Sequence, residues 1–206
     1  MIRLFFLVVA VVVAVTAAVG AYAVATGLDA RGQPGALETR LARIVRSVAI
    51  PRAVRERTYP MPLSPEVLAD GMAHYADHCA SCHANNGSGD TEMGRGLFPK
   101  PPDMRLAATQ DLTDGELFYI IEHGVRFTGM PGWSTGTESG ENATWHLVYF
   151  IRQLSKLTDE DLERMETMNP RSPEEIRQRM EEEKFLRGGD VRPSQPNSHQ
   201  HAGAHK

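Results

Sequence analysis

The pentapeptide Cys79-Ala80-Ser81-Cys82-His83 decides how the rest of this chain is interpreted. Its two cysteines are the only ones among 206 residues, and a histidine directly follows the second. This C-x-x-C-H spacing is the attachment pattern of a c-type haem, in which two thiols on one helical turn form thioethers with the vinyl groups. The adjacent imidazole then reaches the iron from the same side. We therefore expect one covalent haem c, held by Cys79 and Cys82, with His83 as an iron ligand.

Two other uses of a cysteine pair fit this sequence less well. A zinc site needs four ligands, and neither a second cysteine pair nor a His-x-x-x-His pattern follows within the domain. A thioredoxin-type C-x-x-C needs a strand before it in a βαβ unit. Here Ser64-Pro65 signals the start of a helix, with a capping serine and a proline at the first helical position. No thiol remains for a structural disulfide.

Signals on both sides of the motif predict a mostly α fold. The helix that begins after Ser64 runs into the cysteines, and residues 84–111 are rich in Gly, Pro, Asn and Asp, which indicates a loop. Thr113-Asp114-Gly115-Glu116 is a capping box that opens a further helix. Another helix is expected from about residue 142 to residue 154. We place this domain at residues 61–157.

The iron ligand opposite His83 is expected to be Met130. Met130 lies in a loop between glycines and a proline, where backbone can approach a cofactor closely. Met93 and Met104 follow His83 closely in the sequence and are expected to cover its own side of the haem. Three further candidates share the attachment helix and cannot cross the porphyrin: Met72, His74 and His78. Met61 and His146 are the other candidates in the domain, and His123 is the main alternative to Met130.

Residues 64–157 resemble a class I, mitochondrial-type cytochrome c, especially the bacterial single-haem, membrane-anchored versions in larger respiratory chains. The matching segments are Gly71 and Tyr75, the pentapeptide 79–83, Pro101-Pro102, the helix 116–123, Gly129-Met130-Pro131-Gly132-Trp133, and the aromatic helix around Trp145 and Tyr149. The resemblance implies a cytochrome c-like helical domain around one covalent haem and points again to Met130. It also implies that the first helix lets the last one cross closely at Gly71.

The resemblance further implies which residues surround the haem. A proline carbonyl, from Pro101 or Pro102, is expected to accept the imidazole N–H of His83 and to orient the ring. Trp133 and Arg126 are candidate contacts of the haem propionates. Loop packing for Trp133 and a solvated charge for Arg126 are the competing interpretations.

The N-terminal segment 1–28 is interpreted as a transmembrane anchor or a signal. Residues 4–26 carry no charge, and as a helix they would span roughly 34 Å, enough for a hydrocarbon core of about 30 Å. Ala21-Tyr22-Ala23 and Ala23-Val24-Ala25 fit the small-x-small rule for signal cleavage. The expected location is the inner membrane with the haem domain facing the periplasm, or the soluble periplasm after cleavage.

Residues 29–60 form a basic neck, with seven arginines against three acidic residues. Apolar residues recur in it at helical spacing and predict a short amphipathic helix: Leu37, Leu41, Ile44, Val45 and Val48. This helix is compatible with anionic lipid, with a membrane partner, or with a solvated spacer. The chain as a whole has a net charge of −4 and no concentrated basic face, which excludes nucleic acid as a partner.

Beyond the domain, residues 158–187 predict two charged helices, and residues 188–206 are expected to be disordered. Capping signals open the helices at Thr158 with Asp161 and at Ser172 with Glu175. Three histidines in the tail, His199, His201 and His205, offer weak ligands to a divalent metal such as copper or nickel. Incidental histidines in a soluble tail are the competing interpretation.

These features predict an electron carrier rather than an enzyme. Iron with both axial positions filled has no place for substrate, and the chain has one C-x-x-C-H motif. A catalytic haem enzyme would need an open iron position or a second haem. The expected partners are redox proteins that donate and accept single electrons. The alternative is a fixed cytochrome subunit of a larger membrane oxidoreductase complex.

Overall fold

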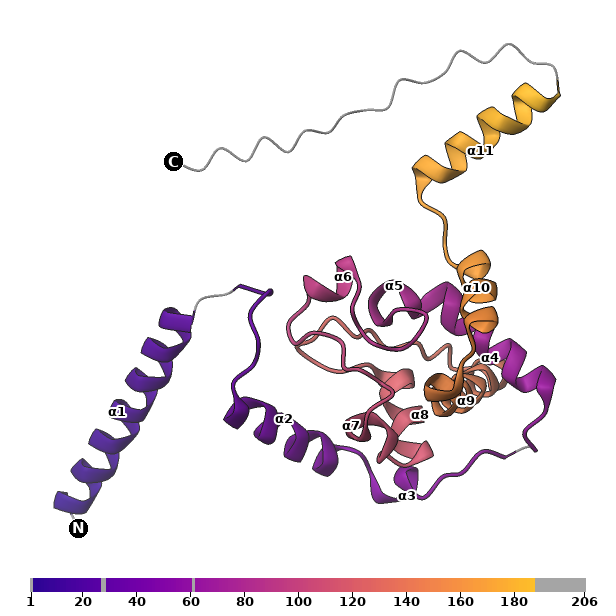
Figure 1. The fold of residues 1–206 in the computed structure, drawn as a ribbon. Helices are drawn as coiled ribbons and strands as arrows, with labels where there is room; N and C mark the ends of the chain where they lie inside the picture. The colour runs from indigo at the N-terminus through magenta and orange to yellow at the C-terminus, as the bar shows by residue number, and fades with distance from the viewer. Residues whose placement is uncertain (1, 27–28, 61, 188–206) are drawn as a thin grey trace, which may run out of the picture. The chain divides into compact units, whose positions relative to one another are not determined.

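A computed structural model describes residues 2–26, 29–60 and 62–187 (Figure 1). The described residues are helical and contain no strand, which confirms the predicted mostly α class. The elements in chain order are α1 (Ile2–Thr26), α2 (Ala36–Ala49), α3 (Arg52–Arg55), α4 (Pro65–His78), α5 (Ala80–His83), α6 (Glu92–Arg95), α7 (Ala107–Gln110), α8 (Asp114–His123), α9 (Glu138–Gln153), the short 3-10 helix η1 (Leu154–Lys156), α10 (Asp159–Met168) and α11 (Pro173–Leu186).

Two compact units divide the chain after Asn169. The first contains α1 to α10, and the second contains α11, whose described side chains are exposed apart from a half-buried Glu181. The histidines of the predicted metal tail, His199, His201 and His205, lie outside the described residues, as does the segment expected to be disordered.

The helices begin where the sequence supplies caps. The Ser64 hydroxyl accepts a hydrogen bond from Val67 N at 3.3 Å, and Pro65 occupies the first helical position of α4. Thr113 with Glu116, Thr158 with Asp161, and Ser172 with Glu175 form reciprocal capping boxes at α8, α10 and α11. Each box satisfies backbone N–H groups that have no partner within the helix. These predicted starts are confirmed.

The centre of the domain is the crossing of α4 and α9. A Cβ built on Gly71 would meet the carbonyl oxygen of His146, so the two backbones touch at this point, as the sequence predicted. On one side of the crossing the Tyr75 ring contacts Phe150, with centroids 5.1 Å apart. On the other face of α9, Trp145 stacks on Phe118 of α8 at 4.5 Å. Large side chains therefore fill the space around the crossing, whereas the contact at Gly71 itself has no room for a side chain.

The last residues of the neck pack on the domain. A Cβ on Gly115 would meet the carbonyl oxygen of Val54, which places α3 directly against the start of α8. The Thr113 hydroxyl donates to Arg55 O at 2.9 Å. The Tyr59 ring lies edge-on to Tyr149 with centroids 4.4 Å apart. These contacts hold the end of the neck against the domain and leave Val54, Arg55 and Tyr59 half-buried, although the sequence there gave no core-forming pattern.

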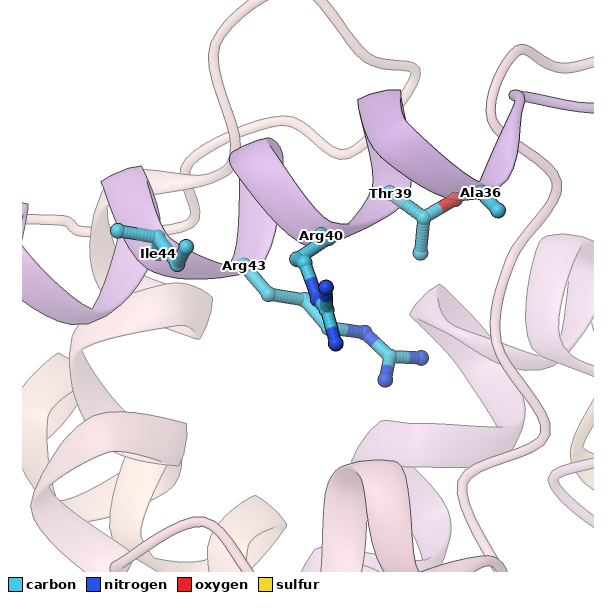
Figure 2. A pocket seen from close by; sticks show the side chains of 5 residues that line it. All are labelled: Ala36, Thr39, Arg40, Arg43 and Ile44. Atoms are coloured by element: carbon cyan, nitrogen blue, oxygen red, sulfur yellow. The ribbon is translucent and has the colours of Figure 1, made fainter.

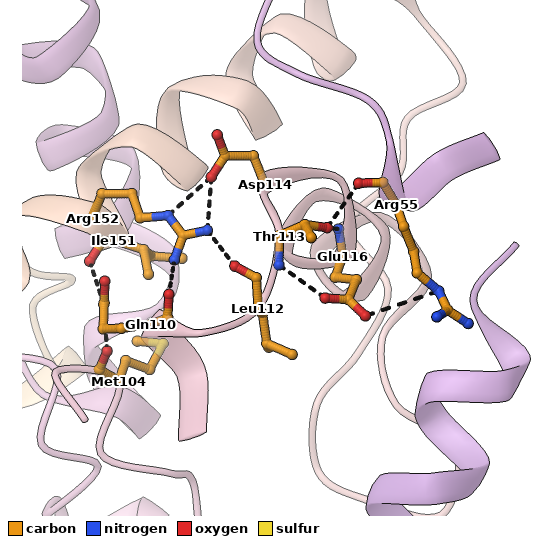
Figure 3. A network of polar contacts seen from close by, with 9 residues as sticks. All are labelled: Arg55, Met104, Gln110, Leu112, Thr113, Asp114, Glu116, Ile151 and Arg152. Carbon is orange, nitrogen blue, oxygen red and sulfur yellow. Dashed lines mark hydrogen bonds and ion pairs between the residues drawn. The ribbon is translucent and has the colours of Figure 1, made fainter. Parts of the chain in front are cut away.

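A polar network ties the loop before α8 to α9 (Figure 3). The Arg152 guanidinium donates to Asp114 at 2.7 and 2.9 Å and to the carbonyls of Gln110 and Leu112 at 2.8 and 2.5 Å. The Gln110 side-chain amide donates in turn to Met104 O at 2.6 Å and to Ile151 O at 3.1 Å. One arginine thus satisfies carbonyls of a segment that has little secondary structure of its own.

Helix α10 also belongs to the first unit. It packs against α4 and inserts Met165, which is fully buried. The sequence presented this helix as one of two charged helices beyond the domain, because a single buried methionine leaves little apolar periodicity.

We expect Gly71→Ala to destabilise the domain by about 1–3 kcal/mol, because the new methyl group would meet backbone rather than a movable side chain. The loss would exceed the gain of about 1 kcal/mol that alanine brings to a helix interior. Thermal unfolding of the haem-loaded protein measures the effect. Gly96→Ala is the matched control, since its Cβ meets one atom, Met93 O, at 3.4 Å. Equal melting temperatures for the two variants would contradict the close crossing.

Candidate functional site

The pentapeptide forms a continuous turn at the end of α4. Cys79 caps α4, and α5 begins at the next residue. His83 N donates to Cys79 O at 2.9 Å, and Cys82 N donates to the same oxygen at 3.2 Å. Both cysteines are free and half-buried. The geometry therefore gathers two thiols and one imidazole on a single helical turn.

The His83 ring is in the neutral form that binds metals. Burial lowers the pKa of its imidazole to about 4, so the ring is unprotonated at neutral pH. Its Nδ1 atom is buried and has no hydrogen-bond partner in this structure. The hydrogen bond expected from His83 to the carbonyl of Pro101 or Pro102 is therefore not formed here. Both proline carbonyls lie instead beside Gly89, where a Cβ would be 2.5 Å from Pro101 O.

The thiols show no sign of a conventional metal site. Burial, and to a lesser extent the nearby Cys82, raises the pKa of Cys79 to about 12, so the free thiol is protonated at neutral pH. Across the described part of the chain, no group of three or more His, Cys, Asp or Glu side chains is placed to hold a metal ion. A zinc site needs four ligands, and this turn supplies two thiols and the neighbouring imidazole.

The loop after His83 is braced by backbone contacts. Gly89 N donates to His83 O at 2.9 Å, and the Tyr75 hydroxyl donates to Ala84 O at 3.1 Å. The Thr91 hydroxyl donates to Cys82 O at 3.2 Å. A Cβ on Gly94 would come within 2.7 Å of the same Cys82 oxygen. The carbonyls at the end of the motif are satisfied, and the loop cannot move away from it freely.

Two methionines predicted to cover the His83 side of the haem do lie with this loop. The sulfur of Met93 is 3.3 Å from the sulfur of Cys82. Met104 is buried, and its N–H donates to Gly87 O at 2.8 Å. Both contacts lie within residues 78–104, which we call the attachment segment.

Met130 lies in a loop folded back on the end of α8. Val125 N donates to Met130 O at 3.1 Å, and Met130 N donates to the Thr128 hydroxyl at 3.1 Å. Gly124 ends α8 with a φ of +66°, and a Cβ there would be 2.6 Å from Met130 O. A left-handed residue without a side chain is required at this position. The Met130 side chain itself is half-buried.

The Met130 loop meets the attachment segment at two places. A Cβ on Gly129 would be 2.7 Å from the side chain of Leu97, which follows α6. The Trp133 ring lies edge-on to His78, the residue before Cys79, with centroids 5.3 Å apart. Trp133 is partly buried against the core, as its packing interpretation requires. The loop that carries Met130 thus touches the chain before and after the turn that carries His83.

Two other residues that the sequence suggested for the haem site are exposed to solvent. Arg126 is exposed. His123, the alternative iron ligand, is also exposed; its Nδ1 is 3.1 Å from Tyr119 O, and its ring stacks on Tyr119 at 4.1 Å.

Sequence reasoning missed a buried polar pair beneath the Met130 loop. The Thr144 hydroxyl donates to Glu122 Oε1 at 2.5 Å, and both side chains are buried. Ser134 N donates to the backbone carbonyl of Glu122 at 3.1 Å. It also missed Arg57, whose guanidinium lies 4.5 Å above the centre of the Phe118 ring. Glu122 and Thr144 occupy positions on α8 and α9 that face the core. A polar residue at a core-facing position was the signal in the sequence that could have revealed this pair.

The donor set fits a covalent haem. Two thiols share one turn with a buried neutral imidazole that has an unpartnered ring nitrogen. Residues 66–151 match the family model for cytochrome C oxidase, cbb3-type, subunit III. These residues therefore form a class I-like c-type cytochrome domain, which confirms the resemblance seen in the sequence. Such a domain transfers electrons by means of c-type haem.

Among solved structures, the chain is similar to the Kuenenia stuttgartiensis reducing HAO-like protein complex Kustc0457/Kustc0458. The identity is 19% and the TM-score 0.40, and the match covers 47% of each chain, so this protein spans about half of that chain's length. No curated protein sequence matches this chain.

Changing the cysteines tests the attachment. Cys79→Ala or Cys82→Ala should each leave one thioether, which shifts the pyridine haemochrome band, whereas the double variant should lose covalent haem and most of its folded domain. Met93→Leu is the matched control, because it alters the contact to Cys82 without removing a thiol. A compact, stable, haem-free double variant, observed by circular dichroism and size exclusion, would contradict the expectation.

Proposed function

We propose that this protein carries single electrons between respiratory components outside the cytoplasm, by means of one covalent haem c with His83 and Met130 as iron ligands. The observation that carries the proposal is the turn of Cys79, Cys82 and His83, with its buried neutral imidazole. The match of residues 66–151 to a cytochrome family supports the same conclusion.

Each residue has a distinct part in this proposal. The haem, when bound, supplies a one-electron couple between ferric and ferrous iron. Cys79 and Cys82 tether it, and His83 donates a ring nitrogen. The Met130 thioether stabilises the ferrous state and so raises the reduction potential. Bracing by Thr128 and Gly124 supports this assignment, because a ligand on a slack loop would not hold its position.

Residues around the ligands are proposed to tune the site. A carbonyl of Pro101 or Pro102 remains the proposed acceptor for His83 Nδ1, since that atom is buried and needs a partner. Trp133 and Arg126 are proposed propionate contacts. Because both axial positions would be filled by protein, we propose no substrate chemistry at the iron.

A retained N-terminal anchor is part of the proposal. Helix α1 is long and apolar enough to cross a membrane, and its side chains are exposed from Ile2 to Ala25. A signal sequence would pass the same test. We propose the periplasmic side for the domain, because c-type haem is attached outside the cytoplasm, with the chain either anchored through residues 4–26 or released by cleavage.

A fixed cytochrome subunit of a membrane oxidoreductase complex is the second candidate. The observation that favours it is the family itself, which is described as subunit III of a cbb3-type cytochrome c oxidase. In that case the donor and acceptor of the electron would be bound within one assembly. A free carrier would instead meet its partners by diffusion.

The Met130 assignment is tested by the iron spectrum. Oxidised protein should show the weak sulfur-to-iron band near the red end of the visible spectrum, and Met130→Ala should abolish it, admit added ligands and lower the potential. Met130→His should keep six ligands but also lower the potential, because imidazole stabilises ferric iron better than thioether does.

Met93→Leu and Met104→Leu are the controls, since both residues lie with the attachment segment and should leave the band in place. An unchanged band in Met130→Ala, together with a lost band in His123→Ala, would transfer the ligand role to His123.

Membrane extraction tests both the anchor and the second candidate. The full chain should stay with membranes through high-salt and carbonate washing, because a helix of this length inserts essentially irreversibly. After solubilisation in mild detergent, a free carrier should elute alone, whereas a fixed subunit should co-purify with its complex. A mature N-terminus near Val24 or Thr26 would establish the cleaved, soluble form instead.

A further inference from the structure

Helix α2 presents an apolar face that the chain does not cover. Its five large apolar side chains are between 52% and 77% exposed, and at helical spacing they fall on one side of the helix: Leu37, Leu41, Ile44, Val45 and Val48. A continuous apolar surface of this kind marks an interaction site, whereas isolated exposed leucines do not.

The flank of α2 beside this face is basic. Arg40 and Arg43 extend from it beside Thr39, and together with Ala36 and Ile44 they line an open hollow (Figure 2). Neither arginine makes an ion pair with a residue that the structure describes. Arg46, one turn further on, is half-buried and interacts electrostatically with Glu116 of the domain. Glu38 is the one acidic residue within the helix.

The position of α2 in the chain limits what can cover its apolar face. Helix α1 ends at Thr26 and α2 begins at Ala36. The residues between them, 27–35, reach at most about 32 Å even when fully extended. A helix tethered this closely to a membrane span stays within reach of the lipid surface. This step rests on the proposed retention of α1 as an anchor.

We propose that α2 lies in the surface of an anionic phospholipid bilayer. Leu41 and its apolar neighbours enter the boundary between headgroups and acyl chains, while Arg40 and Arg43 stay among the lipid phosphates. A strong separation of apolar and basic sides, with arginine on the polar side, is the pattern of helices that lie flat in the interface. The neck then holds the haem domain close to the membrane.

Tryptophan placed on each face of α2 tests this arrangement. Leu41→Trp puts the probe on the apolar face, and Thr39→Trp puts it on the opposite face. The full-length, haem-loaded chain is reconstituted in phosphatidylcholine vesicles with and without phosphatidylglycerol, some carrying nitroxide-labelled acyl chains. The parent chain provides the background from Trp133 and Trp145. Flotation of the vesicles reports separately on α1.

In anionic vesicles, Leu41→Trp should show blue-shifted emission that the nitroxide quenches, whereas the nitroxide should not quench Thr39→Trp, because Thr39 is half-buried on the side away from the apolar face. Adding Arg40→Gln and Arg43→Gln to Leu41→Trp should lower the partition constant of the helix by roughly 25-fold, because each arginine contributes about fivefold near an anionic surface. The blue shift should then be largely lost, although the chain still floats.

The outcomes are separable. A chain that fails to float would overturn the anchor and with it this inference. A chain that floats while the nitroxide quenches Leu41→Trp no more than Thr39→Trp would overturn the inference alone. A blue shift that appears in native membranes but not in vesicles would assign the face to a protein partner instead. Equal quenching with and without phosphatidylglycerol would overturn the requirement for anionic lipid.

Discussion

The backbone of α4 meets the backbone of α9 at Gly71, and the rest of the domain depends on that contact. Because no side chain separates the helices there, their relative position is fixed within the tolerance of close packing. Helix α4 leads directly into Cys79 and α5. Tyr75, one turn after Gly71, packs on Phe150 and donates its hydroxyl to Ala84 O. The crossing therefore positions the attachment turn through one rigid helix and one hydrogen bond.

The same crossing determines where the Met130 loop lies. The face of α9 turned away from Tyr75 carries Trp145, which stacks on Phe118 and so positions α8. Helix α8 ends at Gly124, from which the loop folds back through backbone hydrogen bonds. The two segments that carry the proposed iron ligands are thus attached to opposite faces of one central helix.

What the sequence predicted was mostly local. The capping boxes, the attachment turn and the glycine loop around Met130 each need only neighbouring residues. Gly71 was predicted from a family resemblance. The contact of Gly115 with Val54, the reach of Arg152 to residues 110–114 and the burial of Met165 join residues distant in the chain, and no periodic pattern marks them. The missing His83 hydrogen bond depends likewise on where a distant proline carbonyl comes to lie.

Charge is divided along the chain in a way that suits a tethered electron carrier. The neck holds seven arginines against three acidic residues, whereas residues 61–157 hold twelve acidic residues against six basic ones. If α2 lies on anionic lipid, the same surface attracts the neck and repels the domain. Screening limits both effects to about 8 Å at physiological salt, so the repulsion acts only when the domain nearly touches the membrane.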